Sequence, residues 1–226
     1  MSWDIRSSVR HSALVWLFTP FQWMFLSRIT RALNARNAFR RLEIGPGPRR
    51  LPGFETLNVV GGRSVDYIAD ASKRLPFSDR TFDLIYASHI IEHIPWYQTA
   101  AALREWVRIL KSGGRIEIWT PDGLKIARAF VAAEDGDSSL EYHNDGWWRF
   151  NESKDPCIWM AGRCFSYGDG TGVADHPNWH RALFSERHLR NLMTNAGLID
   201  IHILERTDVR GHDHGWINLG LAGTKP

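Results

Sequence analysis

The first residues that could do chemistry form a short turn in which a carboxylate precedes two glycines. A strand-like run at 41–44 contains Glu43 and is followed directly by Gly45, Pro46 and Gly47. Glycine lets the backbone turn sharply and lets a ligand approach main-chain N–H groups closely. The third glycine of a dinucleotide-binding loop is missing, and an acidic neighbour repels phosphate. The turn therefore suits a ligand with a cationic group better than a pyrophosphate.

A second set of reactive side chains consists of candidate general bases. Asp175, His176 and His180 fall within six residues of one another, and His93 lies far upstream. Imidazole accepts a proton near neutral pH, and a carboxylate beside it can poise it for that role. The alternative for the first three is that they hold their segment together through hydrogen bonds. For His93 we favour a structural role, with a ring nitrogen bonded to a loop carbonyl.

The same histidines raise the question of a metal site. Pro177 breaks a helix, so His176 and His180 are not a metal-binding pair spaced four residues apart on one helix face. A wider set of potential ligands is available, namely Asp175, His176, His180, His212, Asp213 and His214. Their spacing is not diagnostic, and we assign no metal ligand among them.

The elements that must position these residues alternate along the chain. Strands are expected at 41–44, within 53–60, and at 66–70, 81–88, 115–120, 198–204 and 216–222, and helices at 103–110, 124–133 and 185–193. The run 82–87 is apolar except for Asp83, as in a parallel strand covered on both faces. Ser88 and His89 follow at its carboxyl end, where open α/β sheets bind ligands. Ser185 is the expected helix N-cap, and 111–114 is expected to be a turn that ends the preceding helix.

This order of motifs resembles a known family. Leu75-Pro76-Phe77 precedes the run FDLIYASHIIEHI at 82–94, and both lie downstream of the glycine turn. Together they resemble the class I S-adenosylmethionine-dependent methyltransferases, most of all a small bacterial branch with the signature LPF…FDLIYASHIIEHI. The resemblance covers about residues 41–125 and, more loosely, 183–226. It implies an α/β, Rossmann-like fold with a mostly parallel seven-stranded sheet, helices on both faces and an antiparallel C-terminal strand pair.

The resemblance also implies a cofactor and the residues that hold it. S-adenosylmethionine carries an ammonium and a sulfonium group and no phosphate, in agreement with the acidic glycine turn. The implied cofactor-binding residues are Glu43, Gly45, Pro46, Gly47, Asn58, Val60, Asp70, Ala71, Ser88 and His89. Asp70 would accept from the adenine amino group and the Ala71 N–H would meet the ring, whereas the plain alternative for Asp70 is a turn cap.

One position departs from the family pattern. Relatives carry Asp or Glu at the end of the second strand, where it grips both ribose hydroxyls, and Val60 stands at the position where we expect it. Each charge-assisted hydrogen bond of that kind contributes roughly 1.5–3 kcal/mol. Cofactor affinity is therefore expected to be weaker, unless Asn58 or another group substitutes.

Composition limits the class of protein. The 226 residues, 43% of them hydrophobic, are enough for one domain with a sizeable core. A net charge of +3 implies no strong field for nucleic acid, which argues against an RNA methyltransferase as the second alternative. The two cysteines, Cys157 and Cys164, are too few for a disulfide framework and suit the cytoplasm.

Residues 1–40 differ from the rest, and we expect the methyltransferase domain at 41–226. The first segment carries arginines but no acidic residue between Asp4 and Glu43, and its apolar run 13–26 is too short to span a bilayer of about 30 Å. Two interpretations stay open: an interfacial helix pair in peripheral contact with the inner membrane, or a cap over the domain. Residues 123–184 are the expected substrate-side insertion, and its tryptophans either line a site or fix the insertion to the core.

The sequence thus predicts an S-adenosylmethionine-dependent methyltransferase for a small-molecule or glycan-like acceptor, with a role in cell-surface polysaccharide biosynthesis by analogy with relatives. The first alternative is a methyltransferase-like binding or scaffold module that has lost catalysis along with its ribose carboxylate.

Overall fold

The computed structural model describes residues 29–30, 32–47, 50–62, 64–137, 153–165 and 176–226. The chain divides into two compact units, Met1–Ala38 and Phe39–Pro226. In the first unit, residues 29–30 and 32–34 are helical. The membrane-surface and cap interpretations depend mainly on residues 1–28, which lie outside the described part, and both stay predictions. Among the described residues, no helix combines the length and apolar character needed to cross a bilayer.

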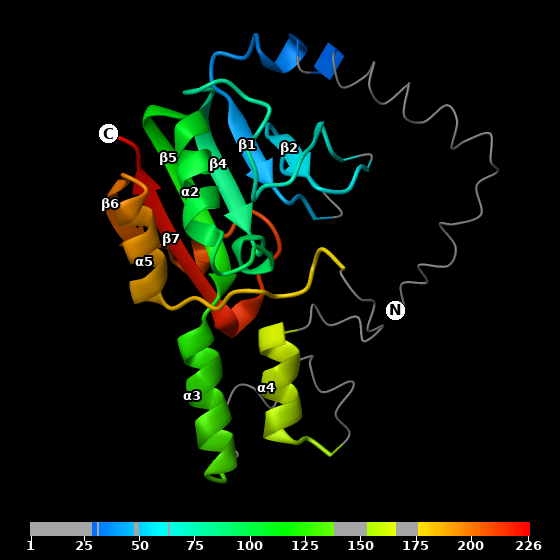
Figure 1. The fold of residues 1–226 in the computed structure, drawn as a ribbon, viewed down its shortest axis with the longest axis vertical. Coiled ribbons are helices and arrows are strands. Elements are labelled where there is room, and N and C mark those ends of the chain that lie inside the picture. Colours follow the sequence, from blue (N-terminus) through cyan, green and yellow to red (C-terminus); the bar gives the residue numbers. More distant parts are fainter. Residues whose placement is uncertain (1–28, 31, 48–49, 63, 138–152, 166–175) are drawn as a thin grey trace, which may run out of the picture. The chain divides into compact units, whose positions relative to one another are not determined.

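The second unit is built on one seven-stranded sheet with the order β3-β2-β1-β4-β5-β7-β6 (Figure 1). Its strands are β1 (Arg41–Ile44), β2 (Glu55–Asn58), β3 (Tyr67–Ile68), β4 (Phe82–Ser88), β5 (Leu110–Pro121), β6 (Ile199–Ile203) and β7 (Asn218–Thr224). Strands β1 to β5 pair in parallel, whereas β7 runs antiparallel to both β5 and β6. The predicted mostly parallel sheet with an antiparallel C-terminal pair is confirmed.

The helices of the second unit join and flank these strands. They are α2 (Thr99–Ile109), α3 (Gly123–Glu134), α4 (Pro156–Phe165) and α5 (Glu186–Asn195), with 3-10 turns η2 (Ile91–His93), η5 (Arg206–Asp208) and η6 (Gly215–Ile217). The predicted cap of α5 is confirmed, because the Ser185 hydroxyl accepts the His188 N–H at 3.3 Å.

The expectation of a turn at 111–114 is wrong. Helix α2 ends at Ile109, and Leu110 already pairs with Phe82 as the first residue of β5. Gly113 has a φ of +75° and donates its N–H to Lys225 O at 2.8 Å, so the glycine pair bends the start of a long strand.

Helices α2 and α5 cover one face of the sheet and form the main core with it. Trp106 of α2 and Leu189 of α5 are fully buried against strand residues such as Ile85 and Ile118. The indole N–H of Trp106 donates to Ala71 O at 2.9 Å, which ties the segment after β3 to this helix. The main core therefore fixes the carboxyl ends of β1, β2 and β3 relative to one another.

The opposite face carries a smaller apolar cluster with a buried charge. Trp119 and Tyr86 pack there with residues from 51–54 and 204–209. Glu117 is 2% exposed and accepts from Arg210 Nε at 2.7 Å and from Arg115 Nε at 2.9 Å. Burial raises the pKa of the Glu117 carboxyl, but the hydrogen bonds from the two guanidinium groups outweigh burial and lower it.

Helices α3 and α4 lie side by side beyond the carboxyl end of β5 (Figure 1). Asp122 caps α3 by accepting the N–H groups of Leu124 and Lys125. Trp159 of α4 is buried and stacks on Trp216 with ring centroids 6.2 Å apart, so this tryptophan fixes part of the insertion to the domain. Trp147 and Trp148 lie outside the described residues.

Candidate active site

A cavity of about 350 Å³ opens at the carboxyl ends of β1, β2 and β3. Of the ten predicted cofactor residues, four line it: Gly45, Asn58, Asp70 and Ala71. Open α/β sheets bind ligands at this end of the strands, beside the point where the strand order reverses, here between β1 and β4. The volume is within the range of small-molecule sites. The sheet therefore places one ligand-sized cavity where the sequence predicted a cofactor.

Gly45 forms the tightest part of the cavity wall. Its φ is +74°, and a Cβ built on it would lie 1.8 Å from Ile90 Cδ1, far inside van der Waals contact. Its N–H donates to Leu57 O at 2.8 Å and so continues the ladder between β1 and β2. A Cβ on Gly47, in contrast, would meet no atom within 4 Å. The turn therefore requires glycine at position 45 and has space for a side chain at position 47.

Glu43 lies outside the cavity lining, on the other face of β1 from Ile44. The carboxylate is 5% exposed, and Oε2 accepts the Leu51 N–H at 2.9 Å. Burial raises the pKa of Glu43, and the Leu51 hydrogen bond and the Arg50 charge lower it in part. In this structure Glu43 holds the segment that follows the glycine turn.

Asn58, and not Val60, ends the second strand. Its side chain lines the cavity, and Oδ1 accepts the N–H of Val59 at 2.8 Å. Val60 is 57% exposed and lies two residues beyond the strand, outside the cavity lining. The position that faces the cavity therefore has an amide in place of the expected carboxylate.

Asp70 and Ala71 form the part of the cavity wall that follows β3. Asp70 Oδ1 accepts both the N–H and the hydroxyl of Ser72, at 2.8 and 2.7 Å, as in a turn cap. This turn holds the Asp70 carboxylate beside the cavity, and the Trp106 hydrogen bond holds the Ala71 carbonyl. Lys73 also lines this wall and adds a positive charge.

The other predicted cofactor residues lie outside the cavity lining: Glu43, Pro46, Gly47, Val60, Ser88 and His89. Pro46 is buried, Gly47 is exposed, and Ser88 ends β4. His89 has the left-handed φ of +53°, which is uncommon for a residue with a side chain. Its Nε2 lies 2.9 Å from Asn218 Oδ1, and its ring stacks on His214 with centroids 3.6 Å apart. The His89 ring therefore contacts the end of β7.

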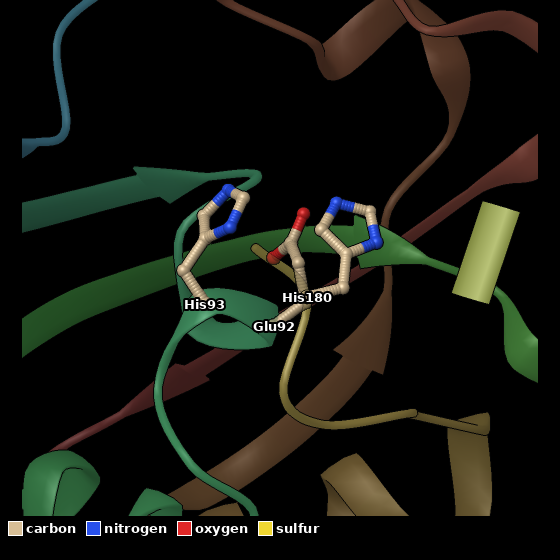
Figure 2. Close-up of side chains that lie close together, drawn as sticks. All are labelled: Glu92, His93 and His180. Atoms are coloured by element: carbon tan, nitrogen blue, oxygen red, sulfur yellow. The ribbon is translucent and has the colours of Figure 1, made fainter. Parts of the chain in front are cut away.

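A carboxylate and two imidazoles meet beside the cavity. Figure 2 shows Glu92 and His93, from η2, together with His180, from the segment before α5. One ligand atom from each of the three lies within 4.8 Å of the other two. The His93 and His180 ring centroids are 5.0 Å apart, and His93 lines the cavity. The segment at 180 is held here because the N–H groups of Arg181 and Ala182 both donate to Glu92 O.

The charges in this cluster are set by burial and by the neighbouring rings. Glu92 is 1% exposed; burial raises its pKa, but the His89, His93 and His180 rings outweigh burial and lower it to about 2. The contact of His89 Nδ1 with Glu92 Oε1 is 3.2 Å long, but it lacks the alignment of a hydrogen bond, so we attribute the effect mainly to charge. Burial lowers the pKa of His180, which keeps this imidazole neutral near pH 7.

The structure separates the predicted bases. His93 and His180 lie in the cluster, whereas Asp175 lies outside the described residues. His176 Nδ1 accepts the Asn178 N–H at 3.2 Å, and His176 lies outside the cavity lining, although Pro177 and Asn178 belong to it. Of the predicted bases in the described part of the chain, two therefore lie beside the cavity and one does not.

Comparison with known proteins gives a match to one family over part of the chain. Residues 50–118 match the family model of the methyltransferase domain. Over these residues the chain is similar to methyltransferase domains. The methyl donor of this domain family is S-adenosylmethionine, as predicted.

Individual proteins are similar to this chain over different lengths. The uncharacterized protein YafE of Escherichia coli (strain K12) is 44% identical over 45 residues, which are 20% of this chain and 21% of that protein. The chain thus matches about a fifth of the length of this curated relative.

Two solved structures match over nearly the whole chain, at low identity. A possible histamine N-methyltransferase from Thermotoga maritima is 19% identical, with 93% of this chain and 96% of that chain covered and a TM-score of 0.47. An S-adenosylmethionine-dependent methyltransferase from Archaeoglobus fulgidus is 13% identical, with 95% and 100% covered and a TM-score of 0.48.

The cavity has the size and the polar groups that S-adenosylmethionine needs. Its volume is about 350 Å³, and Asn58 and Asp70 both belong to its lining. The residues that line the described cavity include no glycine-rich cradle of N–H groups for a pyrophosphate.

Sequence reasoning missed several residues of this site. Glu92 appeared only within the family signature, yet it is the buried centre of the histidine cluster. Trp96 and Tyr97 are 72% and 66% exposed beside the cavity. The signal that could have found all three is their position directly after β4, at the ligand-binding end of the sheet.

Proposed function

We propose that this protein transfers the methyl group of S-adenosylmethionine to a hydroxyl group of a small-molecule or glycan-like acceptor. In this proposal Gly45, Asn58, Asp70 and Ala71 hold the cofactor. When bound, S-adenosylmethionine supplies an electrophilic methyl group on a sulfonium, which is a good leaving group. The protein's task is then to align the acceptor and to assist the loss of its proton.

The cofactor part of the proposal follows from the cavity walls. Gly45, at the carboxyl end of β1, lines the part of the cavity that would receive the methionine end. Asp70, held by its turn with Ser72, accepts from the adenine amino group, and the Ala71 N–H meets the ring. Asn58 hydrogen bonds to the ribose hydroxyls through a neutral amide. Because its Oδ1 already accepts the Val59 N–H, Asn58 binds the ribose more weakly than a carboxylate would.

The acceptor part of the proposal is carried by one observation, the exposed aromatic pair Trp96 and Tyr97. Their rings meet edge to face with centroids 5.6 Å apart, and Tyr97 also lines the cavity. Exposed aromatic side chains beside a cavity stack on apolar ring faces, including those of sugars. This agrees with a glycan-like acceptor and with a role in cell-surface polysaccharide biosynthesis.

The histidine cluster activates the acceptor in this proposal. His93 lines the cavity together with Asp70, and Glu92 and His180 lie next to His93. A hydroxyl that loses its proton during methyl transfer needs a group of this kind within hydrogen-bond reach.

The cofactor assignment is tested by calorimetric titration with S-adenosylhomocysteine. We expect Asn58→Asp to tighten binding by roughly tenfold, because a carboxylate adds a charge-assisted hydrogen bond worth about 1.5 kcal/mol. Asn58→Leu should weaken binding. Val60→Asp tests the position predicted from the sequence. If Val60→Asp tightens S-adenosylhomocysteine binding and Asn58→Asp does not, the assignment of Asn58 is overturned. If the wild type does not bind S-adenosylhomocysteine at millimolar concentration, the scaffold alternative is favoured.

The acceptor assignment is tested by measuring S-adenosylhomocysteine release with methyl glycosides, lipid-linked oligosaccharides and total RNA. We expect release with a saccharide, and Trp96→Ala should raise the KM for that saccharide while leaving the Kd of S-adenosylhomocysteine unchanged. Ile203→Ala, an exposed apolar change on β6, is the matched control. Release with RNA alone would refute the glycan-like acceptor.

A further inference from the structure

The cluster of Glu92, His93 and His180 has the donor set of a metal site. Figure 2 shows the Glu92 carboxylate between the two imidazole rings. All three ligand atoms lie within 4.8 Å of one another, close enough for one ion to contact each of them. Two imidazoles and one carboxylate leave open coordination positions, as in catalytic zinc sites.

The ring nitrogens of His180 are already assigned by a second contact. His180 Nδ1 lies 3.1 Å from Arg163 O, and a carbonyl can only accept, so Nδ1 carries the proton. This leaves Nε2 as the ligand atom. Histidines that bind metals usually donate their other N–H to a carbonyl or carboxylate in this way. The corresponding contact of His93, from Nδ1 to Trp179 O, is longer at 3.4 Å and leaves its ring free to adjust.

A second, independent observation points to a bound cation. Glu92 is 1% exposed, and its Oε1 has no aligned hydrogen bond, although His89 Nδ1 lies 3.2 Å away. Its other oxygen is 3.3 Å from the Thr120 hydroxyl. A buried carboxylate oxygen without a directed partner is costly unless an opposite charge reaches it. The unsatisfied oxygen belongs to the residue that lies between the two histidines.

We propose that Glu92, His93 and His180 bind a divalent transition-metal ion such as Zn²⁺ at the edge of the cofactor cavity. Imidazole nitrogen favours Zn²⁺, Co²⁺ or Fe²⁺ over Mg²⁺, which prefers oxygen ligands. Because His93 lines the cavity, an open position of the ion faces the acceptor side. The ion would bind the acceptor hydroxyl and lower its pKa, and in this respect the inference rests on the proposed function.

The site is tested on the metal-stripped full chain with Co²⁺, whose visible absorption reports its coordination. We expect one Co²⁺ per chain, displaced by Zn²⁺. His180→Ala and Glu92→Gln should each weaken Co²⁺ binding by at least about 100-fold. Replacing a residue that only hydrogen bonds to a metal ligand typically weakens binding by roughly 10- to 100-fold. His202→Ala, an exposed histidine on β6, is the matched control and should leave Co²⁺ binding unchanged.

A folding defect is separated from a lost ligand by two further measurements. Zn²⁺ should raise the melting temperature of the wild type and of His202→Ala but not of His180→Ala. Metal-free His180→Ala should still bind S-adenosylhomocysteine, because His180 lies outside the cavity lining. No Co²⁺ binding by the wild type, or equal binding by His180→Ala, would overturn the metal site while the cofactor titration decides the proposed function separately.

Discussion

The replacement Gly45→Ala tests the structure where its geometry is most restrictive. Gly45 has a φ of +74°, and a Cβ there would lie 1.8 Å from Ile90 Cδ1 and 2.2 Å from Ile90 Cγ1. Two separate penalties follow, one from the left-handed backbone and one from the overlap with Ile90. Ile90 also lines the cavity, so any movement that relieves the overlap changes the cofactor site.

The expected size can be worked out from these two penalties. A left-handed conformation costs a residue with a Cβ about 1–2 kcal/mol. Moving Ile90 away from its preferred rotamer costs about 0.5–1.5 kcal/mol more. Gly45→Ala should therefore destabilise the domain by roughly 1.5–3.5 kcal/mol, the sum of these terms. The displaced Ile90 side chain should weaken S-adenosylhomocysteine binding by about tenfold or more, equivalent to 1.4 kcal/mol.

The assay is a double-mutant cycle with Ile90→Ala, measured by urea unfolding and by calorimetric titration. Ile90→Ala removes both atoms that overlap the new Cβ, so only the backbone penalty should remain in the double variant. Its destabilisation should be smaller than the sum of the single variants by about 0.5–1.5 kcal/mol. Additive effects together with unchanged cofactor affinity in Gly45→Ala would refute the reasoning.

Two further predictions concern stability. Arg40→Met should destabilise the domain by about 3 kcal/mol in urea unfolding, because it leaves Glu55, 3% exposed, without the guanidinium that contacts both of its oxygens; a loss below about 1 kcal/mol would contradict this. The lowered pKa of Glu117 means that its carboxylate contributes stability above the unfolded-state pKa, and this contribution is lost as pH falls through the lower folded-state pKa. In Glu117→Gln, the melting temperature should therefore fall less steeply as the pH decreases on the acid side. A slope below pH 5 equal to that of the wild type would contradict this role of Glu117.

Local signals in the sequence were enough for most of the architecture. The apolar run 82–87 predicted β4 because a strand covered on both faces needs apolar side chains on both. Ser185 predicted the start of α5 because its hydroxyl accepts an N–H from the first helical turn. The same kind of reasoning failed at 111–114, where two glycines suggested a turn, but Leu110 already pairs with β4 and the glycines hydrogen bond to Lys225, directly after β7.

The cofactor residues were predictable only in part. Glycine at position 45 is required by backbone geometry, and the sequence placed it at the end of a strand. Whether Asn58 or Val60 faces the cavity depends on where β2 stops, and strand ends are set by pairing with β1 and β3. The sequence placed that boundary two residues too late.

The sequence by itself determined the order of the motifs along the chain, the glycine turn and the presence of the histidines, because these depend on residue type and short spacing. Only the tertiary structure decided which histidines meet. His180, far along the chain from Glu92 and His93, reaches them because the segment before α5 hydrogen bonds to the backbone of η2, whereas His176, four residues earlier, stays apart. Spacing along the chain carries no information about a contact of that kind, since it depends on how the sheet brings distant segments to one edge.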